Sequence, residues 1–315
     1  MLDSEYRVNW CNDAAREHLG LDAEQDRGQP ILNFVREPAF VEYVRRAEFG
    51  QPVRLQPSGP QPRMLSLQIV SFGQEEHLLL SQDVTGAERL DAMRRDFVAN
   101  VSHELRTPLT VLSGFIETIM DLKLDGARVR DYVSLMAPQA ERMQRLIEDL
   151  LTLSALEYAT APPPGHRVAV RPLLDRIRAE AEALSAARHR ISLSIDSEHD
   201  LAGSEPEIAS AFLNLVTNAV RYTPKGGEIR LRWRSSAEGG EFSVEDTGIG
   251  VDSRHLPRLT ERFYRVEGQK SGERLGTGLG LAIVKHIVNR HRGGLVVESA
   301  IGAGTTFTAY LPVRT

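Results

Sequence analysis

The sequence has almost no cysteine: Cys11 is the only one in 315 residues. A single cysteine cannot form a disulfide within the chain, and it cannot build a cysteine-rich metal site. Cys11, His18 and His77 also lack the spacing of metal ligands, so we predict no metal or haem site among them. So little cysteine is typical of a chain in a reducing compartment.

Long apolar runs and a surplus of positive charge are missing as well. No run of about eighteen apolar residues occurs, so the sequence predicts no membrane-spanning helix. The first residues, MLDSEYRVNW, lack the basic and apolar regions of a signal peptide. The net charge of −5 gives no general attraction to nucleic acid. We therefore expect a soluble, cytoplasmic chain that binds no nucleic acid.

The composition suits a globular protein, because 41% of the residues are hydrophobic, and the length predicts two or three domains. The first of them, residues 1–84, is expected to have a strand at Tyr6–Trp10, helices at Asp13–Leu19 and Phe40–Phe49, and strands at Met64–Ser71 and His77–Ser81. The proline-rich Gln51–Arg63 predicts a loop. This α/β pattern resembles a PAS domain, a sensory module. A spacer or dimerisation domain without a ligand remains the alternative.

Two long amphipathic helices follow this domain. Thr85 and Glu88 have the spacing of a capping box, which predicts a helix from Thr85 to about Leu122. A second helix is expected at Ala127–Tyr158, so the two should form an antiparallel hairpin. One hairpin leaves its apolar stripe exposed to water. We therefore expect residues 85–159 to pair with those of a second chain as a four-helix bundle, which makes the protein a homodimer.

His103 lies beside the apolar stripe of the first helix. The stripe is made by residues that recur every three or four positions: Phe97, Val101, Leu105, Leu109, Leu112, Ile116 and Ile119. Thr107, four residues after His103, shares its helical face. Pro108 cannot donate a backbone hydrogen bond to Glu104, and a kink is expected there. A solvated surface histidine would not need these neighbours.

The remaining sequence predicts a linker at residues 160–166, which contain Pro162–Pro164, and a mixed domain at residues 167–315. The domain is expected to have helices at Leu173–Ala187, Glu205–Tyr222 and Leu279–His291, and strands at Arg190–Asp196, Glu228–Arg234, Glu241–Glu245, Leu295–Ser299 and Thr305–Leu311. This order favours one sheet with helices on one face.

The helix at Glu205–Tyr222 has an unusual polar face. Asn214, Asn218 and Arg221 are spaced four and three residues apart, so they share one side of the helix. Asparagine is unfavourable inside helices, because its side chain competes for backbone hydrogen bonds. Two asparagines on one stripe therefore indicate a purpose beyond folding, although a solvated face alone would also explain them.

Two glycine-rich turns lie later in the domain. Asp246 follows a strand directly, and Gly248 and Gly250 would let the backbone approach a ligand ring closely. The run from Gly276 through Gly278 to Gly280 precedes a helix whose first N–H groups can bind phosphate. The run is not a P-loop, since no Lys-Ser/Thr pair follows it.

These stretches together resemble the sequence boxes of sensor histidine kinases. His103–Pro108, which reads HELRTP, is similar to the phospho-acceptor box. The N, first glycine, F and second glycine boxes of the family's ATP-binding domain are matched, in order, by Asn214–Tyr222, Asp246–Gly250, Glu261–Arg265 and Gly276–Gly280. The resemblance implies a multidomain α+β protein with a helical-hairpin phosphotransfer domain and a C-terminal α/β sandwich that binds ATP.

The resemblance also assigns roles within the ATP-binding domain. It implies that Asn218 holds Mg²⁺ on the ATP phosphates and that Asn214 supports it. Arg221 and Tyr222 would lie near the nucleotide, Asp246 would bind the adenine amino group, and the glycines Gly248, Gly250, Gly276, Gly278 and Gly280 would shape the site. Residues 251–275 would form a mobile lid. Many relatives have lysine where Arg221 stands and Ile-Phe where Leu259-Thr260 stands, but no implied ligand is missing.

The implied activity is ATP-dependent phosphorylation of His103, with Glu104 as the proton acceptor, followed by transfer to an aspartate of a response regulator. Thr107 would position a water that dephosphorylates the regulator. Transfer within one chain and transfer between chains both stay open. The alternatives are a chaperone- or topoisomerase-type ATPase, whose catalytic glutamate is replaced here by Asn214, and an inactive scaffold.

Short stretches outside these boxes narrow the resemblance to the sensors of phosphate-starvation signalling. They are Val8–Asn12, Leu19–Leu21, Arg94–Phe97 and Leu259–Phe263. Such sensors are anchored in the inner membrane by N-terminal helices that this sequence does not contain. We therefore expect the chain to be the cytoplasmic portion of a membrane-anchored protein, which touches the membrane only through segments absent from it.

Overall fold

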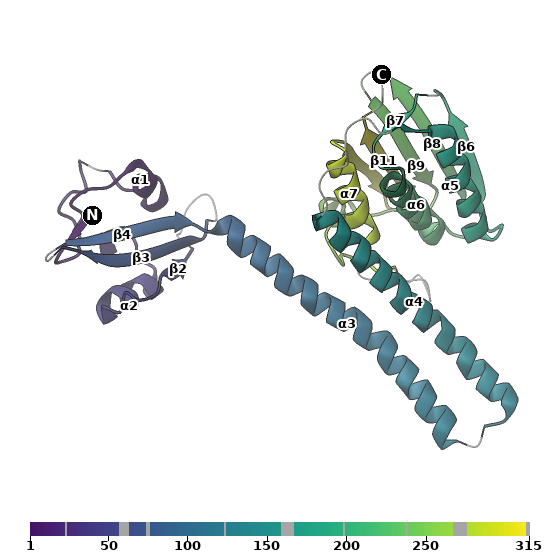
Figure 1. Ribbon diagram of the computed structural model, residues 1–315, viewed down its shortest axis with the longest axis horizontal. Coiled ribbons are helices and arrows are strands. Elements are labelled where there is room, and N and C mark those ends of the chain that lie inside the picture. Colours follow the sequence, from purple (N-terminus) through teal and green to yellow (C-terminus); the bar gives the residue numbers. More distant parts are fainter. Residues whose placement is uncertain are drawn as a thin grey trace. The chain divides into compact units, whose positions relative to one another are not determined.

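The computed structural model of the chain describes residues 1–22, 24–56, 63–73, 76–122, 124–158, 167–197, 199–236, 239–266 and 276–312. The chain has two compact units, Met1–Ala99 and Asn100–Thr315, and each is described by itself (Figure 1). Their boundary lies inside one long helix, so the limits given above for three domains stay a prediction. The predicted linker at 160–166 lies outside the described residues. Across the described helices, none has the length and apolar character needed to span a membrane.

The first unit contains a four-stranded antiparallel sheet in the order β1-β4-β3-β2. Its elements are β1 (Leu2–Asp3), α1 (Asp13–Leu19), η1 (Ile31–Asn33), α2 (Pro38–Arg46), β2 (Val53–Leu55), β3 (Leu65–Phe72) and β4 (Glu76–Asp83). Leu65, Leu67 and Ile69 alternate along β3 and are buried with Phe40 of α2 in one core. The sheet therefore has one face that packs into the core of this unit.

Two of the predictions for residues 1–84 are wrong. Tyr6–Trp10 is not a strand, because Tyr6 has a φ of 57° and only isolated bridges form at Arg7 and Val8. The predicted proline-rich loop contains a strand, β2, which is tolerated beside Pro52 because β2 lies at the edge of the sheet. Residues 57–62 of that loop lie outside the described residues. Helix α1 has the bounds that were predicted, with Asn12 as its N-cap.

Helix α3 (Thr85–Asp121) begins at the predicted residue, but its start does not form the expected capping box. The backbone N–H of Thr85 donates to Asp83 Oδ1 at 2.9 Å, and Thr85 Oγ1 accepts from the Met64 N–H at 2.7 Å. The Glu88 carboxylate pairs with Arg54 instead of the helix start. The hydrogen bonds at Thr85 therefore tie α3 to strand β4 and to the residue before β3.

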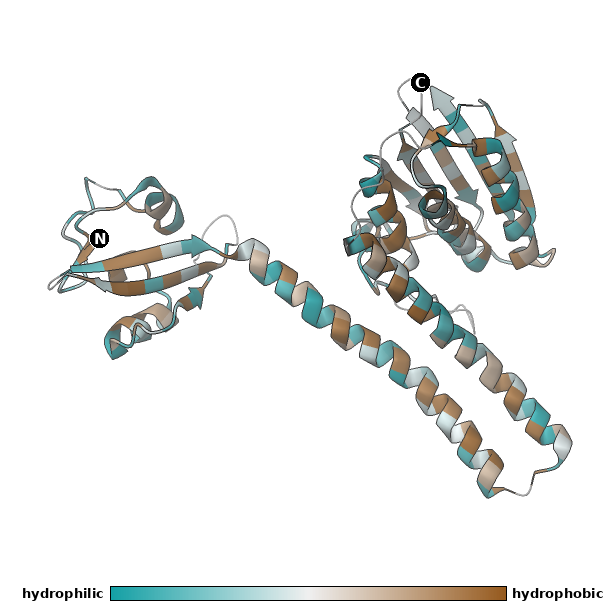
Figure 2. Cartoon of the chain, in the orientation of Figure 1, coloured by the Kyte–Doolittle hydropathy of each residue, from teal (hydrophilic) through white to brown (hydrophobic). Residues whose placement is uncertain are grey.

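In the second unit, the later part of α3 and helix α4 (Gly126–Tyr158) form the predicted hairpin (Figure 1). Helix α3 continues through Pro108, which is buried. The hairpin alternates apolar and polar residues (Figure 2), and several large apolar side chains on it are exposed: Leu109, Ile116, Met120, Val133, Ile147 and Leu151. Buried apolar residues of α4 lie near its end, at Leu146, Leu153 and Leu156.

The C-terminal part is a five-stranded sheet in the order β10-β11-β9-β8-β6, in which only β6 and β8 are parallel. The strands are β6 (Arg190–Ile195), β8 (Glu228–Ser236), β9 (Gly239–Asp246), β10 (Gly294–Ala300) and β11 (Gly304–Leu311). A second, unpredicted sheet joins β5 (Arg167–Val168) to β7 (Leu201–Ala202). The helices are α5 (Val170–Ser185), α6 (Glu205–Tyr222), η2 (Ser253–Arg258) and α7 (Gly280–Arg290).

One face of this sheet is covered by helices, as predicted. Figure 1 shows α5, α6 and α7 in one layer beside the strands. Along β8, Ile229, Leu231 and Trp233 are buried, while the alternating Arg230 and Arg232 are exposed on the other face. Helix α6 provides the centre of the core, where its Phe212 stacks on Phe242 of β9 with ring centroids 4.0 Å apart. The position of α6 is therefore fixed by its buried face, and its polar residues face away from it.

Candidate nucleotide site

The polar face of α6 lines a cleft. Asn214, Asn218, Arg221 and Tyr222 all contribute to its wall. The amide nitrogen of Asn214 donates to the Ser210 carbonyl at 2.9 Å, which turns its amide oxygen outward. That oxygen lies against the first residue of α7, because a Cβ at Gly280 would be only 2.6 Å from it. The spacing seen in the sequence therefore brings two carboxamides and a guanidinium into one cavity.

Asp246 ends β9 at the side of this cleft and is only 5% exposed. Its Oδ1 accepts a hydrogen bond from the Gly248 N–H at 2.8 Å. Burial raises the pKa of the Asp246 carboxyl to about 6, although the backbone N–H groups of Gly248 and Thr305 act in the opposite direction. A buried carboxylate that keeps a cleft-facing position can accept a hydrogen bond from a ligand amine.

The glycines near Asp246 are required by the protein's own packing. A Cβ at Gly248 would lie 2.7 Å from the Tyr222 carbonyl oxygen, and one at Gly250 would lie 1.9 Å from the Ala300 carbonyl oxygen. Gly250 also has a φ of 69°, which other residues rarely adopt. Gly250 lines the cleft with Ile249, whereas Gly248 supports Asp246 from behind. These glycines thus allow close approach of protein segments, in addition to any approach of a ligand.

Gly276, Gly278 and Gly280 line the cleft immediately before α7. Gly278 has a φ of 75°, and its carbonyl accepts from the Phe263 N–H at 2.9 Å. The turn therefore presents the unpaired N–H groups at the start of α7 to the cleft, an arrangement that suits phosphate. Gly276 lies against Arg221, since a Cβ there would be 2.2 Å from the guanidinium.

Several arginine side chains lie around this turn. Arg221 is largely enclosed, and burial lowers the pKa of its guanidinium, with Arg145 and Arg265 acting in the same direction. Arg142, Arg145 and Arg265 also line the cleft. A site with several arginines and a helix N-terminus favours a ligand with multiple negative charges.

Part of the cleft wall comes from helix α4, which the sequence reasoning missed. Its contribution is Arg142, Arg145, Glu148 and Asp149. Thr277 Oγ1 donates a hydrogen bond of 2.6 Å to Asp149 Oδ2, and burial raises the pKa of the Asp149 carboxyl. The positions 142, 145 and 149 share one helical face, which is the only signal the sequence offered. The sequence reasoning also did not place Leu281, Thr305 and Phe307 at the site, whereas Thr217, Val251, Leu259 and Tyr264 lie in the predicted boxes and lid.

His103 and Thr107 are exposed on α3, on the same face as predicted, and Thr107 Oγ1 donates to the His103 carbonyl at 3.3 Å. Neither is among the described residues that line the cleft. Glu104 is paired with arginines: Arg142 donates to its Oε2 at 2.7 Å, and Arg265 lies 3.7 Å from its Oε1. The structure therefore connects Glu104 to the cleft through two cations.

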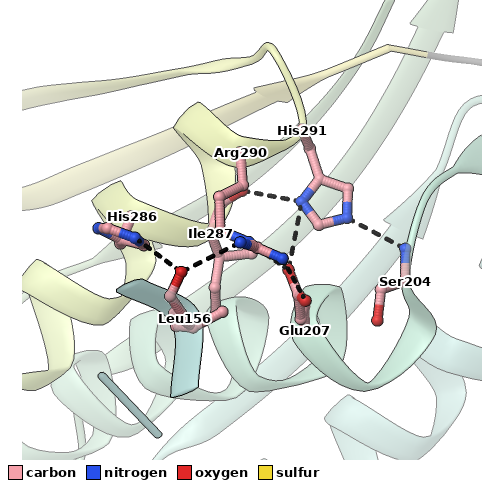
Figure 3. A network of polar contacts seen from close by, with 7 residues as sticks. All are labelled: Leu156, Ser204, Glu207, His286, Ile287, Arg290 and His291. Atoms are coloured by element: carbon pink, nitrogen blue, oxygen red, sulfur yellow. Dashed lines mark hydrogen bonds and ion pairs between the residues drawn. The ribbon is translucent and has the colours of Figure 1, made fainter. Parts of the chain in front are cut away.

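The end of α4 is bound to α7 by a polar network (Figure 3). The Leu156 carbonyl, in the last turn of α4, accepts from Arg290 at 3.0 Å and contacts His286 Nε2 at 3.2 Å. Arg290 also forms two hydrogen bonds of 3.2 Å with Glu207 of α6. The carbonyls of a last helical turn have no partner within the helix, so cationic donors stabilise them. The network holds α4 against both helices that form the cleft.

His291 extends this network inside the C-terminal part. Its Nε2 accepts from the Ser204 N–H at 3.0 Å, and its Nδ1 lies 2.8 Å from the Ile287 carbonyl (Figure 3). The ring therefore carries its proton on Nδ1 and joins the end of α7 to the start of α6.

The predicted lid at 251–275 is described only as far as residue 266. Its described part contains η2, where Asp252 accepts from the Arg254 N–H at the helix start. His255 Nδ1 lies 2.7 Å from the Tyr264 hydroxyl, and Arg258 stacks over the Tyr264 ring at 4.2 Å. Residues 267–275 lie outside the described residues, so the lid stays a prediction.

Comparison with known proteins finds two family matches. Residues 93–159 match the His Kinase A (phospho-acceptor) domain. Residues 203–315 match the histidine kinase-, DNA gyrase B-, and HSP90-like ATPase family. The helical hairpin thus matches the phospho-acceptor family, and the domain that contains the cleft matches the ATPase family.

Two curated relatives align with nearly the whole chain. The phosphate regulon sensor protein PhoR of Pseudomonas aeruginosa is 51% identical over 313 residues, which are 98% of this chain and 70% of that protein. The protein of the same name from Haemophilus influenzae is 29% identical over 98% of this chain and 72% of its own length. Among solved structures, histidine kinase ThkA in complex with response regulator protein TrrA has a TM-score of 0.58 and 19% identity, covering 99% of this chain and 94% of that one. That last likeness shows the fold alone.

We predict that Asp246→Asn raises the thermal stability of the C-terminal part at pH 8 by about 2–4 °C. The reason is that a carboxyl with a pKa of about 6 in the folded state, against 3.8 in the reference state, is ionised at a cost above pH 6. The gain should fade as the pH falls from about 6 to about 4, and it should be absent at lower pH, where the carboxyl is protonated in folded and unfolded chains alike.

Thermal unfolding followed by circular dichroism between pH 4 and pH 8 measures this difference. Glu298→Gln, an exposed carboxylate on the same sheet, is the control and should show no such trend. Equal gains at pH 4 and pH 8 would contradict burial as the cause.

Proposed function

The chain belongs to the two-component sensor histidine kinases, and on that premise we propose that ATP binds in the α6–α7 cleft and phosphorylates His103. As a protein-histidine kinase with the family's ATP-binding domain, the protein uses ATP. What we propose is which residues bind ATP and which take part in phosphoryl transfer. The observation that supports it most is the meeting of the Asn214–Tyr222 face, Asp246 and the glycine turn before α7 in one cleft.

The ends of the nucleotide can be assigned from the chemistry of the cleft walls. Asp246 would accept a hydrogen bond from the adenine amino group, since it is a buried carboxylate that faces the cleft. The triphosphate would lie along Arg221 and the N-terminus of α7, where positive charge and free N–H groups meet. Tyr222, which follows Arg221, would pack beside the nucleotide.

The donor set also fits Mg²⁺. Magnesium prefers hard oxygen ligands and commonly binds through one or two protein oxygens together with substrate phosphates. Asn218 lines the cleft with a carboxamide, and the outward-turned oxygen of Asn214 lies beside the start of α7. Asn218 would hold the ion, and Asn214 would support it. When bound, the ion would neutralise charge on the phosphates.

The transfer step needs a neutral imidazole at His103. A lone pair on one ring nitrogen forms the N–P bond, the bond from the γ-phosphorus to the bridging oxygen breaks, and ADP leaves. The proton on the other ring nitrogen passes to the Glu104 carboxylate. Glu104 is paired with Arg142 and Arg265 in this structure, so proton transfer to its carboxylate would compete with these two ion pairs.

We further infer that the partner is a response regulator and that two chains act as a dimer. The exposed apolar residues of the hairpin support pairing, because a large apolar surface on one copy is stabilised by burial against another. The high identity to phosphate regulon sensors supports a signal connected with phosphate starvation. The four-stranded sheet with helices on one face supports a PAS-like first domain, whose sensory role stays a prediction.

His103→Gln should abolish labelling of the protein by γ-labelled ATP with Mg²⁺, because glutamine has no nucleophilic ring nitrogen. The wild-type phosphoprotein should be acid-labile and base-stable. Mixing His103→Gln chains with Asp246→Ala chains should restore labelling if one chain phosphorylates its partner. Label that persists in the single His103→Gln variant would refute the phospho-acceptor assignment.

Asn218→Ala should weaken Mg²⁺-dependent ATP binding at least tenfold, because the variant loses the proposed oxygen ligand. Isothermal titration with a non-hydrolysable ATP analogue, with and without Mg²⁺, measures this effect. Affinity without Mg²⁺ should change little, and Ser235→Ala, outside the cleft, is a control that should bind normally. Equal affinity of the variant and the wild type in Mg²⁺ would remove Asn218 from the site.

Thr107→Ala should slow dephosphorylation of the phosphorylated regulator at least tenfold and leave labelling of His103 within about twofold, because the hydroxyl is proposed to position water and not to touch ATP. Loss of radiolabel from the purified phospho-regulator gives the rate. Thr110→Ala, which removes an equivalent hydroxyl one turn later, is the matched control. An unchanged rate in Thr107→Ala would contradict the assignment.

A further inference from the structure

Asp149 is a carboxylate that the hairpin, and not the ATP-binding domain, places in the nucleotide cleft. It accepts a hydrogen bond of 2.6 Å from the Thr277 hydroxyl, inside the glycine turn where phosphates are proposed to bind. The same hydroxyl accepts from the Leu279 N–H at 3.3 Å, so Thr277 joins Asp149 to the start of α7. None of the roles assigned above uses this carboxylate.

The charges around Asp149 are mostly positive. Arg145 and Glu148 lie on its own helix, Arg221 faces it from α6, and the neutral Thr277 lies on the turn before α7. Arg221 is also a proposed contact of the triphosphate. An anion that lies among the cations of a phosphate site compensates part of the field that would attract phosphate.

We propose that Asp149 sets the affinity of the cleft for nucleotide phosphates, because it accepts the hydrogen bond of Thr277 and places a negative charge near Arg221, where the triphosphate would bind. The proposal rests on the cleft being the ATP site. Asp149 and a polyphosphate both carry negative charge and use the same neighbours, so they compete. Binding of ATP therefore opposes the contact between α4 and the glycine turn.

The other contacts of α4 connect this competition to the docking of the helix against the ATP-binding domain. The end of α4 is bound through the Leu156 carbonyl to Arg290 and His286 (Figure 3), and Glu157 pairs with Arg262. Leu156 is seven residues after Asp149, about two helical turns, so both contacts lie on one side of α4. Of the described α4 residues that line the cleft, Asp149 is the one that is hydrogen-bonded to the glycine turn. By linkage, phosphate binding weakens the contact between Asp149 and Thr277 by the same factor by which that contact weakens phosphate binding.

The competition depends on phosphate and not on adenine. Adenosine contains the adenine ring that Asp246 would bind, but it has no negative charge that would repel the Asp149 carboxylate. A variant that removes the Asp149 charge should therefore raise the affinity for a triphosphate and leave the affinity for adenosine unchanged.

The test uses the full chain with Asp149→Asn, which keeps the shape of the side chain, and Asp149→Ala, which also removes the hydrogen bond. Titration calorimetry with a non-hydrolysable ATP analogue, ADP and adenosine gives the affinities. We expect both variants to bind the ATP analogue about five- to tenfold more tightly than the wild type, about the size of the interaction between two unit charges 4 Å apart in water. The gain should be smaller for ADP and within twofold for adenosine. Glu141→Gln, an exposed carboxylate about two turns earlier on α4, is the matched control and should match the wild type.

Unchanged or weaker binding of the ATP analogue by both variants overturns the proposal, and so does an equal gain for adenosine. If the wild-type chain binds the analogue and the variants show no gain, only the role of Asp149 fails. If the wild-type chain binds neither nucleotide nor adenosine, the assignment of the cleft fails, and the proposal fails with it.

Discussion

The site depends on the packing of one helix. The buried side of α6 is fixed against the sheet by Phe212, which stacks on Phe242, and by its apolar neighbours in the core. A helix held in this way has only one outward face, and the residues of that face are set by the 3.6-residue period. Asn214 and Asn218 could not both reach the cleft if α6 rotated by one residue. The core thus determines the chemistry of the cleft as well as the stability of the domain.

A second constraint comes from the end of α4. Its terminal carbonyls need donors, and α7 supplies them through Arg290 and His286. This contact brings a helix of the phosphotransfer hairpin to the wall of the nucleotide cleft, where Asp149 meets Thr277. The phospho-acceptor helix is connected to the same cleft through the pairing of Glu104 with Arg142 and Arg265. The two halves of the enzyme therefore share charged residues in this arrangement.

Local patterns predicted most of the helices and strands, but few of the specific contacts between distant residues. The helix at Glu205–Tyr222 has the predicted bounds, because its apolar period and its first-turn Pro206 are local signals. The strand predicted at Tyr6–Trp10 failed because a local turn occupies its start. Asp3 Oδ1 accepts hydrogen bonds from the N–H groups of Glu5 and Arg7, and Tyr6 between them has a left-handed backbone. Asp149 was missed for a different reason. Its helix was predicted correctly, but only the docking of α4 onto α7 shows that this carboxylate faces a cleft built more than sixty residues later.

Burial has opposite consequences for ligand binding at Asp149 and at Asp246. Burial raises the pKa of both carboxyls, so each is ionised at some cost in the cleft. If the proposed site is right, an adenine amino group that donates a hydrogen bond to Asp246 would compensate that cost. A triphosphate near Asp149 would increase the cost there and would favour breaking the contact between Asp149 and Thr277. Because the adenine and the phosphates belong to one molecule, binding at Asp246 would supply free energy for displacing Asp149 from Thr277. On this proposal, nucleotide binding and the loss of one contact between the hairpin and the ATP-binding domain would be one coupled event.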